Sequence, residues 1–172
     1  MKRGILKTVL FALASVMLMS GCTVSYRLNG ASIDYNTIKT ITIETFSNRA
    51  AYQWAPMPPM FNTSLSDKYN NQTKLSQVKR DGDLALSGEI TSYDQTNKSI
   101  SADGYSSMVQ LKMTVKVKFV NNKRHSDDFD KAFSANREYD SSQQLSSVQE
   151  ELVQQMIDDI VDQVFNATVA NW

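Results

Sequence analysis

Few residues of this 172-residue chain have side chains suited to catalysis or metal binding. The chain has one histidine, His125, within the basic run Lys123-Arg124-His125, and one cysteine, Cys22. Nucleophilic hydrolysis needs a serine or cysteine with a base within hydrogen-bond reach, and that base is commonly histidine. The sequence contains no Gly-x-Ser-x-Gly motif, phosphate-binding glycine loop or metal-spaced histidine pair. It therefore predicts a protein that is not an enzyme and that binds no cofactor or metal.

Two groups of aspartates are the remaining candidates for metal binding or acid–base chemistry. They are Asp127, Asp128 and Asp130, and Asp158, Asp159 and Asp162. The first group lacks the regular ligand spacing and the glycine turn of a calcium loop. The second lies beside the apolar stripe of a predicted helix, where a solvated face is expected. Both groups are interpreted as surface positions without a catalytic role.

Three lysines of one predicted strand form the main charged feature of the sequence. Because side chains alternate along a strand, Lys112, Lys116 and Lys118 project from the same face. This row of ammonium groups could bind anionic lipid or phosphate. The alternative, which we favour, is the solvated side of a half-covered antiparallel sheet, where lysine also discourages edge-to-edge pairing.

The N-terminus has the features of a bacterial lipoprotein signal peptide. Three basic residues among the first seven overlap an almost uncharged apolar stretch up to Met19, and the small pair Ser20-Gly21 precedes Cys22. The apolar stretch is shorter than the roughly 20 residues that a membrane-spanning helix needs. We therefore predict that residues 1–21 are removed and that the lipidated Cys22 anchors the protein to a membrane.

The mature chain is predicted to contain one folded domain. Removal of residues 1–21 changes the net charge from zero to −3, and nothing indicates a nucleic-acid partner. About 150 residues suffice for one ordinary hydrophobic core. The mixed polar composition of residues 22–36 predicts a lipidated tether, and residues 37–172 form the predicted domain.

Period-two alternation predicts four strands. The clearest is residues 108–120, in which apolar residues occupy the odd positions. Related patterns predict strands over residues 37–46, 84–90 and 129–139. The turn Asn121-Asn122-Lys123 is expected to join the last two strands into a hairpin.

Two amphipathic helices complete the predicted domain. Pro58-Pro59 favours a helix start, after which apolar residues from Phe61 to Tyr69 recur every four positions. Ser146 or Ser147 is expected to cap the last helix, whose apolar stripe runs from Val148 to Val164. The order β-α-β-β-β-α predicts an α+β single domain with about four strands in a mixed sheet and two helices on one face.

The proline-rich segment before the first helix contains large apolar side chains, namely Trp54, Met57 and Met60. Unless something covers them, they expose apolar surface. Packing beneath the segment's own helix is favoured over contact with a partner protein.

Several short segments have a distinctive sequence. They are Phe46-Ser47-Asn48-Arg49-Ala50, Asp81-Gly82-Asp83-Leu84, Gly88-Glu89-Ile90 and the C-terminal stretch from Phe165 to Trp172. Together with the lipoprotein cysteine, they resemble the LptE-type lipopolysaccharide-assembly lipoproteins, in the version found in the Bacteroidota, over nearly the whole chain. This resemblance implies the same β-α-β-β-β-α fold.

The resemblance also implies a function. Such proteins are outer-membrane lipoproteins that face the periplasm, plug an LptD-type β-barrel translocon, assist its assembly and help deliver lipopolysaccharide to the cell surface. In this chain, Lys112, Lys116 and Lys118 are the candidate lipopolysaccharide-binding residues. Thr23 after the cysteine, with no acidic cluster following, is consistent with a periplasm-facing outer-membrane anchor. The alternative is a lipid- or peptidoglycan-binding accessory lipoprotein of another envelope system.

Overall fold

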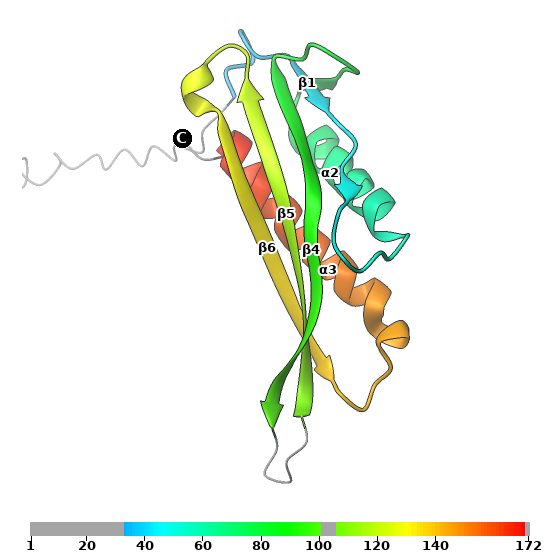
Figure 1. The fold of residues 1–172 in the computed structure, drawn as a ribbon. Coiled ribbons are helices and arrows are strands. Elements are labelled where there is room, and N and C mark those ends of the chain that lie inside the picture. Colours follow the sequence, from blue (N-terminus) through cyan, green and yellow to red (C-terminus); the bar gives the residue numbers. More distant parts are fainter. Residues whose placement is uncertain (1–32, 101–105, 171–172) are drawn as a thin grey trace, which may run out of the picture.

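The computed structural model describes residues 33–100 and 106–170 (Figure 1). The predicted signal peptide, Cys22 and most of the predicted tether lie outside the described residues. The last residues of that tether already belong to the folded part, because Ile33 is buried and Asp34 accepts a hydrogen bond from the Asn36 amide at 3.0 Å. The ordered domain therefore begins before residue 37.

The described strands form one mixed sheet. They are β1 (Thr40–Ile43), β2 (Ser47–Asn48), β3 (Ser76–Gln77), β4 (Leu84–Ile100), β5 (Ser106–Asn121) and β6 (Phe129–Asp140). The order is β3-β1-β4-β5-β6, and β2 also pairs with β4. The strands β4, β5 and β6 are antiparallel, whereas the β1–β3, β1–β4 and β2–β4 pairs are parallel. The α+β class and the mixed sheet are confirmed, but the sheet has six strands rather than four.

The two extra strands and the length of β4 are the main differences from the sequence prediction. The strands β2 and β3 have two residues each, too few to display alternation. Strand β4 continues to Ile100, well past the predicted end at Ile90, with a register shift between Ile90 and Ser92. Its distal half is polar, so only its pairing with β5 identifies it as a strand.

Two long helices cover one face of this sheet, α2 (Met57–Gln72) and α3 (Leu145–Phe165) (Figure 1). The proline pair lies at the start of α2, as predicted. Helix α3 begins at Leu145, after Gln144, so the predicted cap at Ser146 or Ser147 is wrong. The Ser147 hydroxyl instead donates to the Gln144 carbonyl at 2.7 Å, and the partly buried Leu145 packs the first turn against the core.

The two helices contact each other directly. The Lys68 ammonium of α2 lies 2.7 Å from the Asp162 carboxylate of α3. The buried Tyr69 hydroxyl bonds the Thr168 hydroxyl in the π-helical turn Asn166–Ala170 that follows α3. Burial raises the pKa of Tyr69 above its usual value.

The core lies between these helices and the inner face of the sheet. Every odd position of β5 from Val109 to Phe119 is at most 5% exposed. The proline-rich segment joins this core, because Met57 is fully buried and Trp54 and Met60 pack against it. Packing of this segment on its own domain is thus confirmed.

Gly88 of β4 lies at a closely packed point of the core. A Cβ atom at this position would lie 2.1 Å from the Lys116 carbonyl oxygen and 2.5 Å from Cε1 of Phe46. Phe46 is fully buried, and its ring packs on Phe61 at a centroid distance of 5.1 Å. A glycine is therefore needed for Phe46 to pack against the sheet.

We predict that Gly88→Ala lowers the free energy of unfolding by about 3 kcal/mol, because the added methyl group must displace the β5 backbone or the Phe46 ring. Urea denaturation measures this change. The neighbouring Ser87→Ala serves as the control and should shift stability by no more than about 0.5 kcal/mol. Equal stability of the wild type and Gly88→Ala would contradict the packing described.

Candidate functional site

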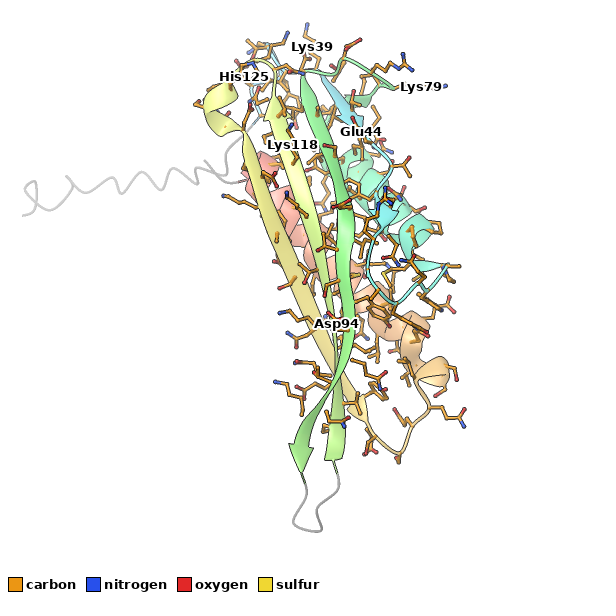
Figure 2. All side chains as sticks on the ribbon, viewed as in Figure 1. Lys39, Glu44, Lys79, Asp94, Lys118 and His125 are labelled. Atoms are coloured by element: carbon orange, nitrogen blue, oxygen red, sulfur yellow. The ribbon has the colours of Figure 1, made fainter. Side chains whose placement is uncertain are left out.

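The outer face of the sheet, opposite the helices, is polar. Lys112, Lys116 and Lys118 are exposed on this face, while the odd residues of β5 point into the core, so the predicted shared face is confirmed. Figure 2 shows Lys118 near one end of the sheet and Asp94 farther along it. The structure thus places the three lysines on one surface.

Acidic residues on the adjacent strands accompany these lysines. Lys112 lies opposite Asp94, and Lys118 lies opposite Asp130. The Lys116 ammonium lies 3.2 Å from the Asp130 carboxylate, with both side chains about half exposed. Such an exposed pair contributes at most about 1 kcal/mol of stability. Within the described part of the chain, neither Lys112 nor Lys118 forms an ion pair, so these two remain available to an anion.

A shallow hollow of about 260 Å³ lies on this outer face. Its lining includes Lys116 and Lys118 together with Glu89 and Asp130. Two positive and two negative groups therefore face the same space, and an anion entering it would meet repulsion as well as attraction.

A second cavity, of about 350 Å³, opens beside the distal half of β4. Tyr52 at its edge is 48% exposed, and its ring stacks on that of Tyr93 at a centroid distance of 5.5 Å. The buried Gln149 donates a hydrogen bond to the Tyr93 hydroxyl at 3.1 Å. Leu111 and Leu145 also line this cavity, which can therefore hold an apolar or flat group.

Sequence reasoning missed this cavity. Tyr52 and Tyr93 are 41 positions apart in the sequence and belong to no motif. The register shift after Ile90 changes which positions of β4 face the core. Simple alternation along the sequence therefore does not predict that Tyr93 is buried. The remaining polar lining is Asp94 and Gln95, which provide hydrogen-bond acceptors but no nucleophile with an adjacent base.

The first aspartate group has structural partners near the β5–β6 connection. Asp127 accepts hydrogen bonds from the Asn121 side-chain amide at 2.9 Å and from Arg124 at 2.6 Å. His125 Nδ1 lies 3.0 Å from the Asp128 carboxylate. This carboxylate also accepts a hydrogen bond from the backbone amide of Asn121 at 2.7 Å. This bond to the Asn121 amide is the main reason that the pKa of Asp128 is lowered.

Two residues of the second aspartate group connect α3 to neighbouring elements, and the third forms a hydrogen bond within the helix. Asp159 lies 2.8 Å from Arg137 of β6, Asp162 pairs with Lys68 of α2, and Asp158 accepts a hydrogen bond from Gln154. Within residues 33–100 and 106–170, no group of three or more histidine, cysteine, aspartate or glutamate side chains is arranged to hold a metal ion.

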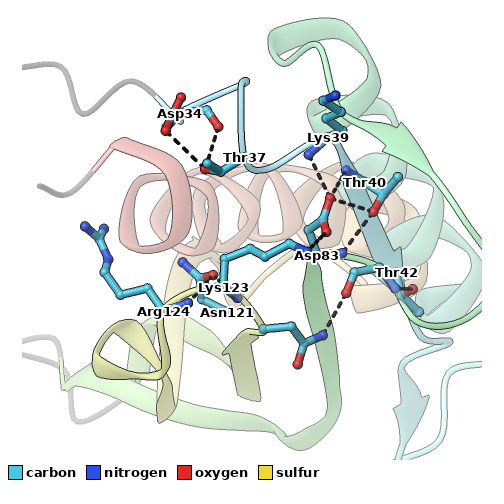
Figure 3. Close-up of polar contacts among 11 residues, drawn as sticks. Asp34, Thr37, Lys39, Thr40, Thr42, Asp83, Asn121, Lys123 and Arg124 are labelled. Carbon is cyan, nitrogen blue, oxygen red and sulfur yellow. Dashed lines mark hydrogen bonds and ion pairs between the residues drawn. The ribbon is translucent and has the colours of Figure 1, made fainter.

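Asp83 joins three segments at one end of the sheet (Figure 3). One carboxylate oxygen accepts the backbone amides of Lys39 at 2.8 Å and Thr40 at 3.1 Å, and the Thr40 hydroxyl at 3.0 Å. The other oxygen lies 2.9 Å from the Lys123 ammonium in the β5–β6 connection. The Lys39 amide and the Lys123 ammonium hold the pKa of Asp83 well below its usual range. Asp83 therefore acts as an anionic structural link.

We predict that Asp83→Asn lowers the free energy of unfolding by about 2 kcal/mol near neutral pH, because the charge-assisted contacts are lost. A carboxylate with a lowered folded-state pKa stabilises the protein above its unfolded pKa of about 4 and loses that contribution as the pH falls. The difference in the free energy of unfolding between the variant and the wild type should therefore shrink below about pH 4.

Urea denaturation at several pH values tests this prediction. Asp81→Asn is the matched control, because Asp81 is exposed at a positive φ of 55°, which asparagine tolerates. If the free energies of unfolding of Asp83→Asn and the wild type differed by the same amount from acid to neutral pH, the ionised carboxylate of Asp83 would not be the stabilising group.

Comparisons with known proteins identify a matching family and similar structures. A family model described as LptE, lipopolysaccharide-assembly, matches residues 38–168. A minor lipoprotein from Acinetobacter baumannii is similar in structure, with 17% identity, a TM-score of 0.54 and coverage of 78% of this chain and 94% of that one. Uncharacterized lipoprotein B from Nitrosomonas europaea has 15% identity and a TM-score of 0.55, with coverage of 77% and 83%. Rare lipoprotein B from Shewanella oneidensis has 13% identity and a TM-score of 0.51, with coverage of 75% and 92%.

The structural similarities, at these low identities, concern the fold alone. The comparison with curated protein sequences gives no match. Among the described residues, no helix is long and apolar enough to cross a membrane. The family model extends from just before β1 into the turn that follows α3. The matched range includes Asp83 and Gly88. This chain therefore belongs to the LptE family of lipopolysaccharide-assembly proteins.

Proposed function

We propose that this protein is a non-enzymatic outer-membrane lipoprotein that faces the periplasm, plugs an LptD-type β-barrel translocon and assists its assembly. The single observation that carries the proposal is the family match over residues 38–168. A subunit of such a translocon would help deliver lipopolysaccharide to the cell surface without catalysing a reaction.

The proposed anchor is a lipid on Cys22. The described chain begins at Ile33, so ten residues lie between it and the cysteine proposed to be lipidated. Since an extended chain spans at most about 3.5 Å per residue, the folded domain would lie within about 40 Å of the membrane surface. This distance allows the domain to reach the periplasmic entrance of a barrel in the same membrane.

The surface of the domain supports a plug inside a barrel. The three long strands β4, β5 and β6 present a polar outer face, which matches the polar lumen of a large outer-membrane barrel. The apolar side chains of β5 are already covered by the helices of the same chain. Contact with the barrel would therefore use hydrogen bonds and charged groups more than apolar burial.

We predict that the tagged, lipidated protein copurifies from membranes in mild detergent with a large outer-membrane β-barrel in equal amount. Mass spectrometry and quantitative gels identify the partner and its stoichiometry. An untagged strain and a tagged, unrelated outer-membrane lipoprotein serve as controls. Recovery of the protein without any barrel would contradict the translocon role.

We also propose that Lys112, Lys116 and Lys118 contact phosphate groups of lipopolysaccharide. Lys112 and Lys118 carry the proposal, since they are exposed without an ion pair in the described part of the protein. Lys116 is already engaged by Asp130, and a ligand phosphate would have to compete with that carboxylate. Solvation of the sheet face remains the alternative.

We predict that the double variant Lys112→Ala/Lys118→Ala weakens lipopolysaccharide binding by about tenfold, which corresponds to the loss of two exposed charge contacts of about 0.7 kcal/mol each. Binding of purified lipopolysaccharide to the immobilised protein measures this effect. The control variant Lys98→Ala/Lys131→Ala removes two exposed lysines elsewhere. An equal loss in both variants would favour the solvated-face interpretation.

The alternative function is that of a lipid- or peptidoglycan-binding accessory lipoprotein of another envelope system. The cavity beside Tyr52 and Tyr93 favours it, because exposed aromatic rings around a concave site bind small ligands in many proteins. Such a protein would purify without a barrel, so the copurification experiment also separates the two functions.

A further inference from the structure

One end of the molecule carries exposed cations without partners. Lys39 precedes β1, and Lys79 and Arg80 lie in the connection between β3 and β4. All three residues are exposed, and no ion pair of the described chain involves them. Figure 2 shows Lys39 and Lys79 at the same end of the molecule as His125.

The acidic groups at this end are largely engaged. Asp83 is neutralised by Lys123, and Asp127 by Arg124. Asp128 accepts hydrogen bonds from the Asn121 amide and from His125. Asp34 and Asp81 are also exposed at this end and form no ion pair in the described part of the chain, so the cations Lys39, Lys79 and Arg80 outnumber these two carboxylates.

The opposite end has the reverse balance. Glu138 and Asp140 lie at the end of β6, and Glu150 and Glu151 lie in the first two turns of α3. All four are exposed. The exposed cation on the neighbouring part of β4 is Lys98, so negative side chains predominate there. In a mature chain predicted to carry a net charge of −3, the two ends thus differ in their balance of exposed charges.

The described chain also begins at the cationic end. Asp34 and Lys39 appear in the same close-up as Asp83 and Lys123 (Figure 3). The segment that connects Ile33 to Cys22 therefore joins the domain next to the exposed cations. If Cys22 is lipidated, as the proposed function requires, this end is held within reach of the bilayer that contains the lipid.

We propose that the surface formed by Lys39, Lys79 and Arg80 binds anionic phospholipid headgroups of the membrane that holds the anchor. Basic side chains near an anionic bilayer are attracted to it within a Debye length of about 8 Å. Arginine can also bind a phosphate through two parallel hydrogen bonds. In the absence of the barrel, the domain then stands with the far ends of β4 and β5 directed away from the headgroups, and its acidic end is kept from the surface by repulsion.

Vesicle sedimentation tests the proposal with the mature chain, residues 22–172, carrying Cys22→Ser so that no lipid contributes. We expect binding to vesicles of phosphatidylglycerol and phosphatidylcholine, weakening at high salt, and no binding to pure phosphatidylcholine. The triple variant Lys39→Ala/Lys79→Ala/Arg80→Ala should lower the partition coefficient at least about tenfold, since each basic residue near the surface contributes severalfold.

The matched control variant is Arg49→Ala/Lys98→Ala/Lys131→Ala, which also removes two lysines and one arginine from exposed positions. It should retain binding within about twofold, because these side chains lie elsewhere on the surface. An equal loss in both variants, or equal binding of the wild type to neutral vesicles, would overturn the proposal. Circular dichroism confirms that each variant is folded.

A single fluorescent label tests the orientation. Ser76→Cys labels β3 beside Thr40 at the cationic end, and Thr96→Cys labels β4 at the distal end. With a polarity-sensitive dye, we expect a blue shift on anionic vesicles for position 76 and none for position 96. A shift at position 96 alone, or equal shifts at both positions, would overturn the orientation. Neither experiment uses a barrel, so its failure is distinguishable from failure of the translocon role.

Discussion

The strict alternation of β5 is the constraint on which the rest of the structure depends. It gives the sheet one face of large apolar side chains, from Val109 to Phe119, and burial of that face is the main favourable contribution to folding. Both helices must lie on this side, and Gly88 must leave room for Phe46 beside them. The other side of the sheet is consequently left polar and open to a partner.

The same arrangement distinguishes the two ends of the molecule. At one end, Asp83 links the start of β1 to the β5–β6 connection, and the chain joins the domain nearby. Toward the other end, β4 and β5 extend beyond the cover of α2 (Figure 1). The cavity beside Tyr52 lies between the two ends, where Tyr93 and Asp94 of β4 line it. The polar outer face connects these ends. The described chain begins at one end of the sheet, and two strands extend beyond α2 at the other. This arrangement suits the proposed subunit, which would be held by its anchor at one end and contact another protein.

The features that could be predicted from the sequence are those that produce a pattern among neighbouring residues. Alternation in β5 and the proline pair before α2 predicted those elements, because burial and proline geometry act on nearby residues. The distal half of β4 was missed because its side chains are polar. The partners of Lys116 and Asp83 were missed because cross-strand register is not visible in the sequence, and the Tyr52–Tyr93 stacking joins distant segments. The predicted lipidation of Cys22 remains a prediction, since this residue lies outside the described part.

The most direct test of the account is depletion of this protein in its host, with lipopolysaccharide at the cell surface measured separately from total lipopolysaccharide. We expect surface lipopolysaccharide to fall while total lipopolysaccharide is maintained, and the wild-type protein to restore it. It also predicts that Cys22→Ser restores it poorly, because the anchor is lost. Unchanged surface lipopolysaccharide after complete depletion would contradict a role in its assembly at the surface.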